Sequence, residues 1–227
     1  ALNGHELGGI HETFVHWFYP GQHNLTPGLL ILFMICVFVA QLFTRPIDGA
    51  LYSMTATLGG SLYTTLTTAH ALLLFAYPKG VFYLTFFVVM PIAMDSGAYF
   101  AGRWFGRHNA GLKVSPKKTY EGYVGGIIFT VLVGIGWLYG WKNYGLESYR
   151  TLQMSYVEAG VYAFLLSILS IFGDLAESAF KRDAKTKDSA STIPGHGGML
   201  DLADAIYLCI PIGYYIMLFR QMLGLSF

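Results

Sequence analysis

Charged residues are scarce in this sequence. Asp, Glu, Lys and Arg make up 12% of its 227 residues, against about 25% in an ordinary soluble domain. Apolar residues make up 54%, and the mean hydropathy is +0.49. This balance excludes an ordinary soluble domain and indicates an integral membrane protein. The formal net charge of +1 gives no reason to expect nucleic acid as a partner.

Cysteine is nearly absent as well. Cys36 and Cys209 both lie inside apolar runs, so neither a disulfide nor a metal site of the CxxC type is expected. The chain also lacks an initiator Met, and its first residues do not form a signal peptide. We therefore expect a trimmed or partial chain, with room for further spans upstream. We find no internal repeat and no low-complexity region.

Long apolar runs are what the sequence has in abundance, and six of them reach the length of about 20 residues that a membrane helix needs. The fold class that they predict is all-α: a polytopic transmembrane helical protein. The second run is rich in Thr and is compatible with one tilted helix or with two shorter pieces. The histidine-containing segment 1–20 is expected to lie at the membrane interface. The predicted spans are residues 25–43, 51–76, 81–102, 122–141, 157–180 and 202–219.

The basic residues are divided unevenly between the two sides that six spans define. Ten of them fall in the loops after the first, third and fifth spans, and four fall on the other side. The positive-inside rule places the richer side in the cytoplasm, although such loops can also serve only to bind anionic lipid headgroups. The ten are Arg45, Arg103, Arg107, Lys113, Lys117, Lys118, Lys181, Arg182, Lys185 and Lys187, and the four are Lys79, Lys142, Arg150 and Arg220.

Five of the carboxylates that lie inside or near the predicted spans are the most informative. They are Asp95, Asp174, Glu177, Asp201 and Asp204. Charges at such depth are costly and usually mark a functional site, although one Asp can also be a structural residue that caps a helix or pairs with an Arg. All five lie towards the side of the basic loops. Carboxylates beside Lys and Arg at one membrane face predict a divalent metal that holds a phosphorylated substrate.

Three segments carry a distinctive order of residues. The longest is SAFKRDAKTKDSASTIPGHGGMLDLAD, residues 178–204; the second is DSGAYFAGRWFGRHNAGLKVSPKKTYEGYVGG, residues 95–126; the third is GDLAES, residues 173–178. Together they resemble the signature of the phosphatidate cytidylyltransferases (CDP-diacylglycerol synthases) over roughly residues 91–204. The match has one departure, because Leu202 stands where the family pattern has Arg between the two aspartates.

The departure bears on activity rather than on fold. An Arg between the two aspartates can contact a phosphate or orient a carboxylate, and Leu202 can do neither. Two interpretations stay open. Either the family activity is kept, with Arg182 or Lys187 compensating, or the chain is an impaired variant or one with an altered substrate.

The resemblance implies a reaction and its partners. The family transfers a cytidylyl group from CTP to phosphatidate, which gives CDP-diacylglycerol and pyrophosphate in phospholipid biosynthesis. The implied cofactor is Mg²⁺, as two metal ions or with a second, monovalent cation. The implied partners are CTP, phosphatidate and membrane lipids, with a homodimer carried over from the family. The implied location is a bacterial inner membrane, with the active site on the cytoplasmic side.

The resemblance also assigns roles to residues. The implied metal ligands are Asp174, Asp201, Asp204 and Asp95. The implied catalytic residues are Asp174, Asp201, Asp204, Lys181 and His196. The implied substrate-binding residues are Lys117, Lys118, Arg182, Lys187, Ser115, Thr119, Gly197 and Gly198. Glu121 is expected to pair with a neighbouring Lys, and Glu177 to support Asp174 from the same helix face. His196 either donates to a phosphate or stabilises its turn.

The motifs predict a division of the chain into an N-terminal membrane region, residues 1–90, and a catalytic membrane domain, residues 91–227. Two other functions remain open at this point. One is a membrane nucleotidyltransferase that acts on another lipid phosphate. The other is an ion-coupled transporter, but carriers often bind near the midplane between repeated halves, whereas here the carboxylates gather towards one face.

Overall fold

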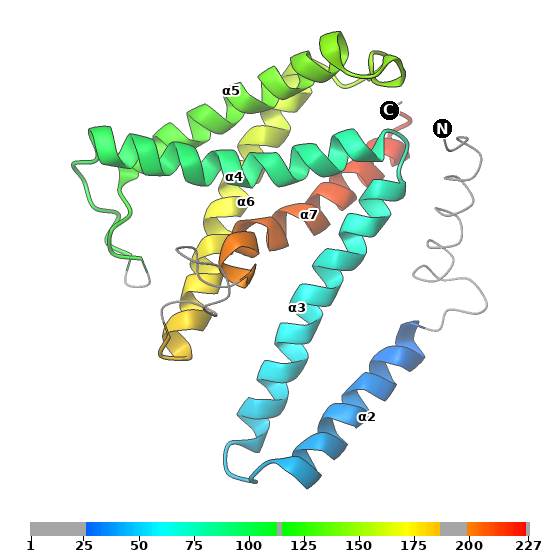
Figure 1. The fold of residues 1–227 in the computed structure, drawn as a ribbon, viewed down its shortest axis with the longest axis vertical. Helices are drawn as coiled ribbons and strands as arrows, with labels where there is room; N and C mark the ends of the chain where they lie inside the picture. Colours follow the sequence, from blue (N-terminus) through cyan, green and yellow to red (C-terminus); the bar gives the residue numbers. More distant parts are fainter. Residues whose placement is uncertain (1–25, 113–114, 187–198, 226–227) are drawn as a thin grey trace. The chain divides into compact units, whose positions relative to one another are not determined.

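The protein is helical throughout the part described by the computed structural model, which is residues 26–112, 115–186 and 199–225 (Figure 1). These residues form no β-strand, which confirms the all-α prediction. The α-helices are α2 (Thr26–Thr44), α3 (Ala50–Ala76), α4 (Gly80–Phe105), α5 (Tyr120–Tyr144), α6 (Tyr156–Asp183) and α7 (Met199–Met222), with a short 3-10 helix η1 (Glu147–Tyr149) between α5 and α6.

Five of these helices are long and apolar enough to cross a membrane, so the chain is a multi-pass membrane protein. They correspond to the first and to the third to sixth predicted spans. The second predicted span is one continuous helix of 27 residues, α3, rather than two pieces. Its many Thr residues, together with Ser and His, keep α3 outside the set of apolar helices, so a membrane crossing by α3 stays a prediction.

The described helices group into two compact units that divide between Tyr77 and Pro78. The first unit contains α2 and α3, which contact each other across a short connection. Gly49 is the N-cap of α3 and has a φ of 75°, a left-handed conformation that Gly adopts without steric cost. The second unit contains α4 to α7. The division into residues 1–90 and 91–227 rests on motifs and stays a prediction.

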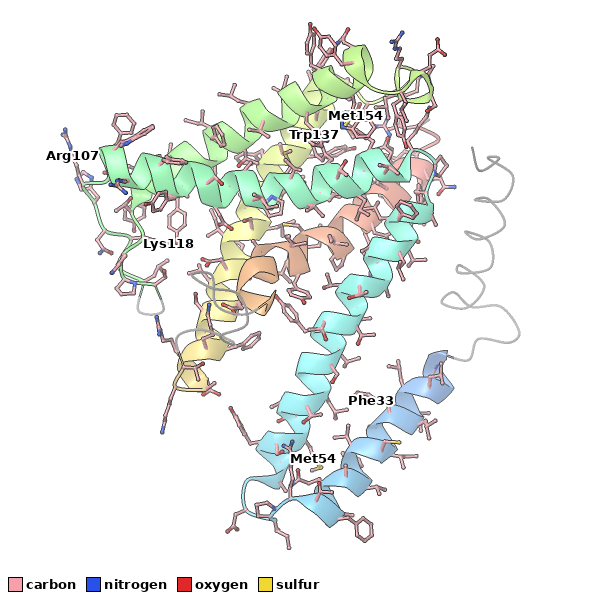
Figure 2. All side chains as sticks on the ribbon, viewed as in Figure 1. Phe33, Met54, Arg107, Lys118, Trp137 and Met154 are labelled. Atoms are coloured by element: carbon pink, nitrogen blue, oxygen red, sulfur yellow. The ribbon has the colours of Figure 1, made fainter. Side chains whose placement is uncertain are left out.

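Helix α4 is the centre of the second unit, because it contacts α5, α6 and α7. Its N-terminal half is buried on almost every side: Phe82, Tyr83, Phe86 and Phe87 are all 0% exposed. A helix that is apolar all round is expected inside a bundle rather than at its surface. Figure 2 draws the side chains of the described helices as sticks.

Small residues bring α4 and α5 close together, and the two helices lie side by side in Figure 1. A Cβ on Gly122 would lie 2.9 Å from the Ala98 carbonyl oxygen, and a Cβ on Gly126 would lie 2.9 Å from the Met94 carbonyl oxygen. Small residues at such positions let helix backbones approach closely in membranes. The close approach places the N-terminus of α5 against the C-terminal half of α4, where the candidate site lies.

Candidate functional site

The segment between α4 and α5 folds back on itself. Asn109 and Thr119 form an isolated antiparallel bridge. The Ala110 N–H donates to the Lys118 carbonyl oxygen at 2.8 Å, and the Tyr120 N–H donates to the His108 carbonyl oxygen at 3.0 Å. Because the two ends of the segment pair with each other, the lysines near its end have a defined direction.

Asn109 joins the first part of the segment between α4 and α5 to its later part. Its side-chain oxygen accepts from the Gly111 N–H at 2.7 Å, and its side-chain amide donates to the Pro116 carbonyl oxygen. An Asn that bonds the backbone two residues later stabilises a tight turn. Gly111 has a φ of 68°, a conformation that favours Gly. Asn109 therefore positions the run Ser115–Thr119 without being part of it.

Two contacts fix the start of α5. The Thr119 hydroxyl oxygen accepts from the Gly122 N–H at 3.2 Å, which makes Thr119 the N-cap of the helix. The Glu121 carboxylate lies 2.5 Å from His108 Nδ1 and also accepts from the His108 N–H. We expected Glu121 to pair with a Lys, but its partner is this His, which binds the start of the segment to its end.

A cleft of about 730 Å³ lies between α4, α6 and this segment. Six residues that the sequence nominated from distant positions line it together: Asp95, Ser115, Lys117, Lys118, Thr119 and Asp174. Asp95 and Asp174 come from two different helices, and the other four come from the segment before α5. The cleft therefore joins carboxylates with lysines and hydroxyls, as a site for a phosphorylated ligand requires.

Lys118 reaches across the cleft and forms an ion pair with Asp174, 56 positions later in the chain. The Lys118 and Asp174 side chains are 28% and 20% exposed. The Lys118 ammonium also lies 5.8 Å from the centre of the Tyr123 ring, within cation–π range. Figure 2 labels Lys118 on the segment that precedes α5.

Arg103 and Tyr99 are among the cleft residues that the sequence reasoning missed. The Arg103 guanidinium donates to the Tyr99 hydroxyl at 3.0 Å. We had counted Arg103 only as a topology signal. Asp95, Tyr99 and Arg103 follow one another at intervals of four, which places them on one face of a helix, so this spacing was a usable signal.

Comparison with known proteins decides the family. The chain matches the cytidylyltransferase family over residues 10–220. The chain belongs to this family. Similar proteins named phosphatidate cytidylyltransferase occur in Haemophilus influenzae, with 38% identity over 140 residues, 62% of this chain and 47% of that relative. The protein of that name in Synechocystis sp. is 39% identical over 125 residues, 54% of this chain and 39% of the relative.

A third relative with the same name, from Bacillus subtilis, is 33% identical over 138 residues, 61% of this chain and 48% of the relative. The chain thus spans about half the length of the curated relatives it matches. These matches give no support to the alternative of an ion-coupled transporter.

Two further residues that the family resemblance nominated lie on α6 but do not line the cleft. Lys181 pairs with Glu177, whose side chain is 0% exposed, one helical turn earlier. Arg182 is exposed, and its guanidinium lies 3.5 Å from the Thr186 carbonyl oxygen. Their roles towards the phosphates of a cytidylyltransferase substrate stay predictions, as does support of Asp174 by Glu177.

The rest of the nominated set falls outside the description. Asp201, Leu202 and Asp204 belong to the first turns of α7, but their side chains lie outside the described residues. The following nominated residues lie wholly outside the described ranges: Lys187, His196, Gly197 and Gly198. Their predicted roles are untouched by the geometry above.

The described part of the cleft fits a magnesium ion only in part. Among the described residues, no group of three or more His, Cys, Asp or Glu side chains gathers as metal ligands. Asp95 and Asp174 nevertheless share one cleft, and Mg²⁺ is usually held by one or two carboxylates, with substrate phosphates and water as its other ligands. The donor set is therefore of the right chemistry for a metal that arrives together with a nucleotide.

Proposed function

We propose that this chain carries the catalytic core of a phosphatidate cytidylyltransferase, which transfers the cytidylyl group of CTP to phosphatidate and releases pyrophosphate. The observation that carries the proposal is the cleft in which Asp95, Asp174 and the Ser115–Thr119 run meet. The names of the similar proteins support the same substrates.

The chemistry explains why such a cleft needs charge rather than a strong base. The nucleophile is a phosphate oxygen of phosphatidate, which is already ionised at neutral pH. It attacks the α-phosphorus of CTP, a new P–O bond forms, and the bond to the β-phosphate oxygen breaks, so that pyrophosphate leaves. The barrier is the approach of one anion to another, which fixed positive charges lower.

The cations of the cleft are well placed for this task. Lys117, Lys118 and Arg103 would contact the phosphates of CTP and phosphatidate, because all three line the cleft. Ser115 and Thr119 add hydroxyl donors. The first turn of α5 adds the positive end of a helix, which favours bound anions.

Magnesium is the cofactor that we propose for this site. Asp95 and Asp174 would hold it, joined by Asp201 and Asp204 from the start of α7. When bound, the metal neutralises phosphate charge and aligns the displacement. The carboxylates alone would repel the substrates, so they support catalysis only as metal ligands.

We propose an orientation in the membrane from the basic residues at the two ends of the second unit. Three basic residues at the end away from the cleft have protein partners: Lys79 donates to the Ser148 carbonyl oxygen, Lys142 donates to the Met154 carbonyl oxygen at 2.7 Å, and Arg220 pairs with Glu158. Lys117 and Lys118 line the cleft together with Arg103, so we propose that the end with the cleft is the cytoplasmic, nucleotide-binding face. We propose a bacterial inner membrane and a homodimer as the setting.

The test is an assay of this chain in detergent micelles with phosphatidate, with and without CTP and Mg²⁺, together with Leu202→Arg. Formation of CDP-diacylglycerol that needs both CTP and Mg²⁺ supports the proposal. Activity of Leu202→Arg alone would identify the natural chain as an impaired form. If this chain and Leu202→Arg are both inactive with phosphatidate but active with another lipid phosphate, the acceptor has been assigned wrongly.

A further inference from the structure

Lys118 and Asp174 carry roles that conflict with their contact. The lysine is a phosphate-binding residue and the aspartate is a metal ligand in the proposed function, yet the two side chains are bound to each other. While the Lys118 ammonium group contacts Asp174, it does not contact a phosphate. The oxygen that accepts from Lys118 is Asp174 Oδ2, and this oxygen does not bind a metal ion while the contact lasts.

The surroundings explain why the pair forms. Both side chains are mostly buried, at 28% and 20% exposure, and a charge in such a place is costly unless it has a partner. The Tyr123 ring supports the ammonium group from one side. The Tyr123 hydroxyl is buried and has no hydrogen-bond partner among the described residues, so this corner of the cleft still has one donor to offer a ligand.

The Lys118 side chain is also flexible enough to move away from Asp174. It is a flexible four-carbon stem with a compact charge, and Lys118 is the residue just before the N-cap of α5. Phosphates bound at the start of α5 would therefore lie within reach of the same side chain. A short movement would exchange one anionic partner for another.

From these contacts we infer that Lys118 is the resident counter-ion of Asp174: it takes the place of the metal while the cleft is empty and moves onto the phosphates when the metal–nucleotide complex enters. The inference rests on the proposed function, because it concerns the metal and the nucleotide of that reaction. It follows that Asp174 binds a metal weakly in the absence of nucleotide. It follows too that metal and nucleotide favour each other, since each removes a competitor of the other.

The experiment measures the two ligands separately, on the full chain in detergent micelles. Binding of Mn²⁺ without nucleotide is followed by the loss of the free-ion signal in electron paramagnetic resonance. Binding of CTP in excess EDTA is followed by calorimetry. The variants are Lys118→Met and Lys118→Gln, which remove the charge, Lys118→Arg, which keeps it, and Asp174→Asn. Lys117→Met is the matched control, because Lys117 lines the same cleft one position earlier.

The expected changes have opposite signs. Loss of the Lys118 charge strengthens Mn²⁺ binding about tenfold, a usual size for the coupling of two sites, and weakens CTP binding. Lys118→Arg restores weak Mn²⁺ binding, and Asp174→Asn abolishes the gain when combined with Lys118→Met. Lys117→Met weakens CTP binding but leaves Mn²⁺ binding little changed. A lysine with only a structural role would weaken both ligands or neither.

Three results would overturn the inference. One is Mn²⁺ binding that is unchanged or weaker in both charge-removing variants. Another is an equal gain in Lys117→Met, which would indicate a general electrostatic effect. The third is the absence of Mn²⁺ binding in every variant. Lys118→Gln keeps the test decisive if Lys118→Met does not fold, as judged by its elution from a sizing column.

The outcome is separable from that of the proposed function. If no variant makes CDP-diacylglycerol but the opposite changes in Mn²⁺ and CTP affinity appear, the counter-ion role stands and the acceptor lipid is wrong. If the chain is active but the affinities do not change in opposite directions, the proposed function stands and the counter-ion role falls.

Discussion

Arg220, in the last turn of α7, is paired with Glu158 in the first turn of α6, and its side chain is only 3% exposed. Glu158 also accepts from the Ser155 N–H at 2.7 Å and completes a capping box there. One carboxylate thus serves both the start of α6 and the end of α7. The pair fixes α7, whose other end carries two of the proposed metal ligands.

Arg220→Met should therefore lower stability, because it leaves a half-buried carboxylate without its cation. We expect a cost of about 3 kcal/mol, the lower end of the range for a broken buried pair. The measurement is the apparent unfolding midpoint in detergent. Glu158→Gln combined with Arg220→Met should cost less than the sum of the single changes. Simple additivity of the two would show that the pair contributes nothing.

Gly126→Val should separate α4 from α5. A Cβ at this position would lie 2.8 Å from the Met94 sulfur and 2.9 Å from the Met94 carbonyl oxygen, and the backbone cannot move aside as a side chain can. Overpacking of this kind costs about 1 to 3 kcal/mol. Gly136→Val is the matched control in the same helix, because a Cβ there meets nothing within 4 Å. Equal losses of thermal stability in both variants would contradict the packing argument.

The fold was largely predictable because hydropathy alone marks membrane helices. Five of six expected spans are apolar helices, since a chain in lipid must satisfy its backbone groups within helices. The exception, α3, is rich in Thr. Thr67 and Thr68 bond to backbone oxygens four residues earlier, so the helix forms, but its composition does not by itself predict a crossing.

The residues that line the cleft were predictable in part, but their contacts were not. The motifs nominated Asp95, Asp174 and the Ser115–Thr119 run, and both aspartates line one cleft with four residues of that run. Nothing in the sequence indicates that Lys118 meets Asp174, since the two are 56 positions apart and their approach depends on how α6 crosses the α4–α5 pair. The His108–Glu121 contact was missed for a similar reason: it depends on the backbone pairing of the segment between them.

Asn109→Ala should impair nucleotide binding although Asn109 does not line the cleft. Without its side chain, the Gly111 N–H and the Pro116 carbonyl oxygen lose their partner, and the lysines of the segment lose their fixed direction. We expect the KM for CTP to rise by about tenfold, which corresponds to about 1.4 kcal/mol, with a smaller change in kcat. Asn109→Asp keeps the acceptor for Gly111 but not the donor to Pro116. Its KM for CTP should therefore lie between those of the unchanged chain and of Asn109→Ala. An equal fall in kcat and kcat/KM would assign the residue a different role.

Asp95→Asn and Asp174→Asn test the metal assignment most directly. Each change keeps the shape of the side chain but removes the negative charge that a magnesium ion requires, so each should reduce CDP-diacylglycerol formation by at least about a hundredfold, the scale of losing one strong electrostatic contact in a transition state. The loss should be partly recovered at raised Mg²⁺, because weaker ligands need more metal for the same occupancy. Asp174→Asn should lower the unfolding midpoint by no more than Lys118→Met does, because both changes break the same ion pair. Elution from a sizing column separates misfolding from loss of metal, and full activity with an unchanged Mg²⁺ dependence in either variant would remove that carboxylate from the metal site.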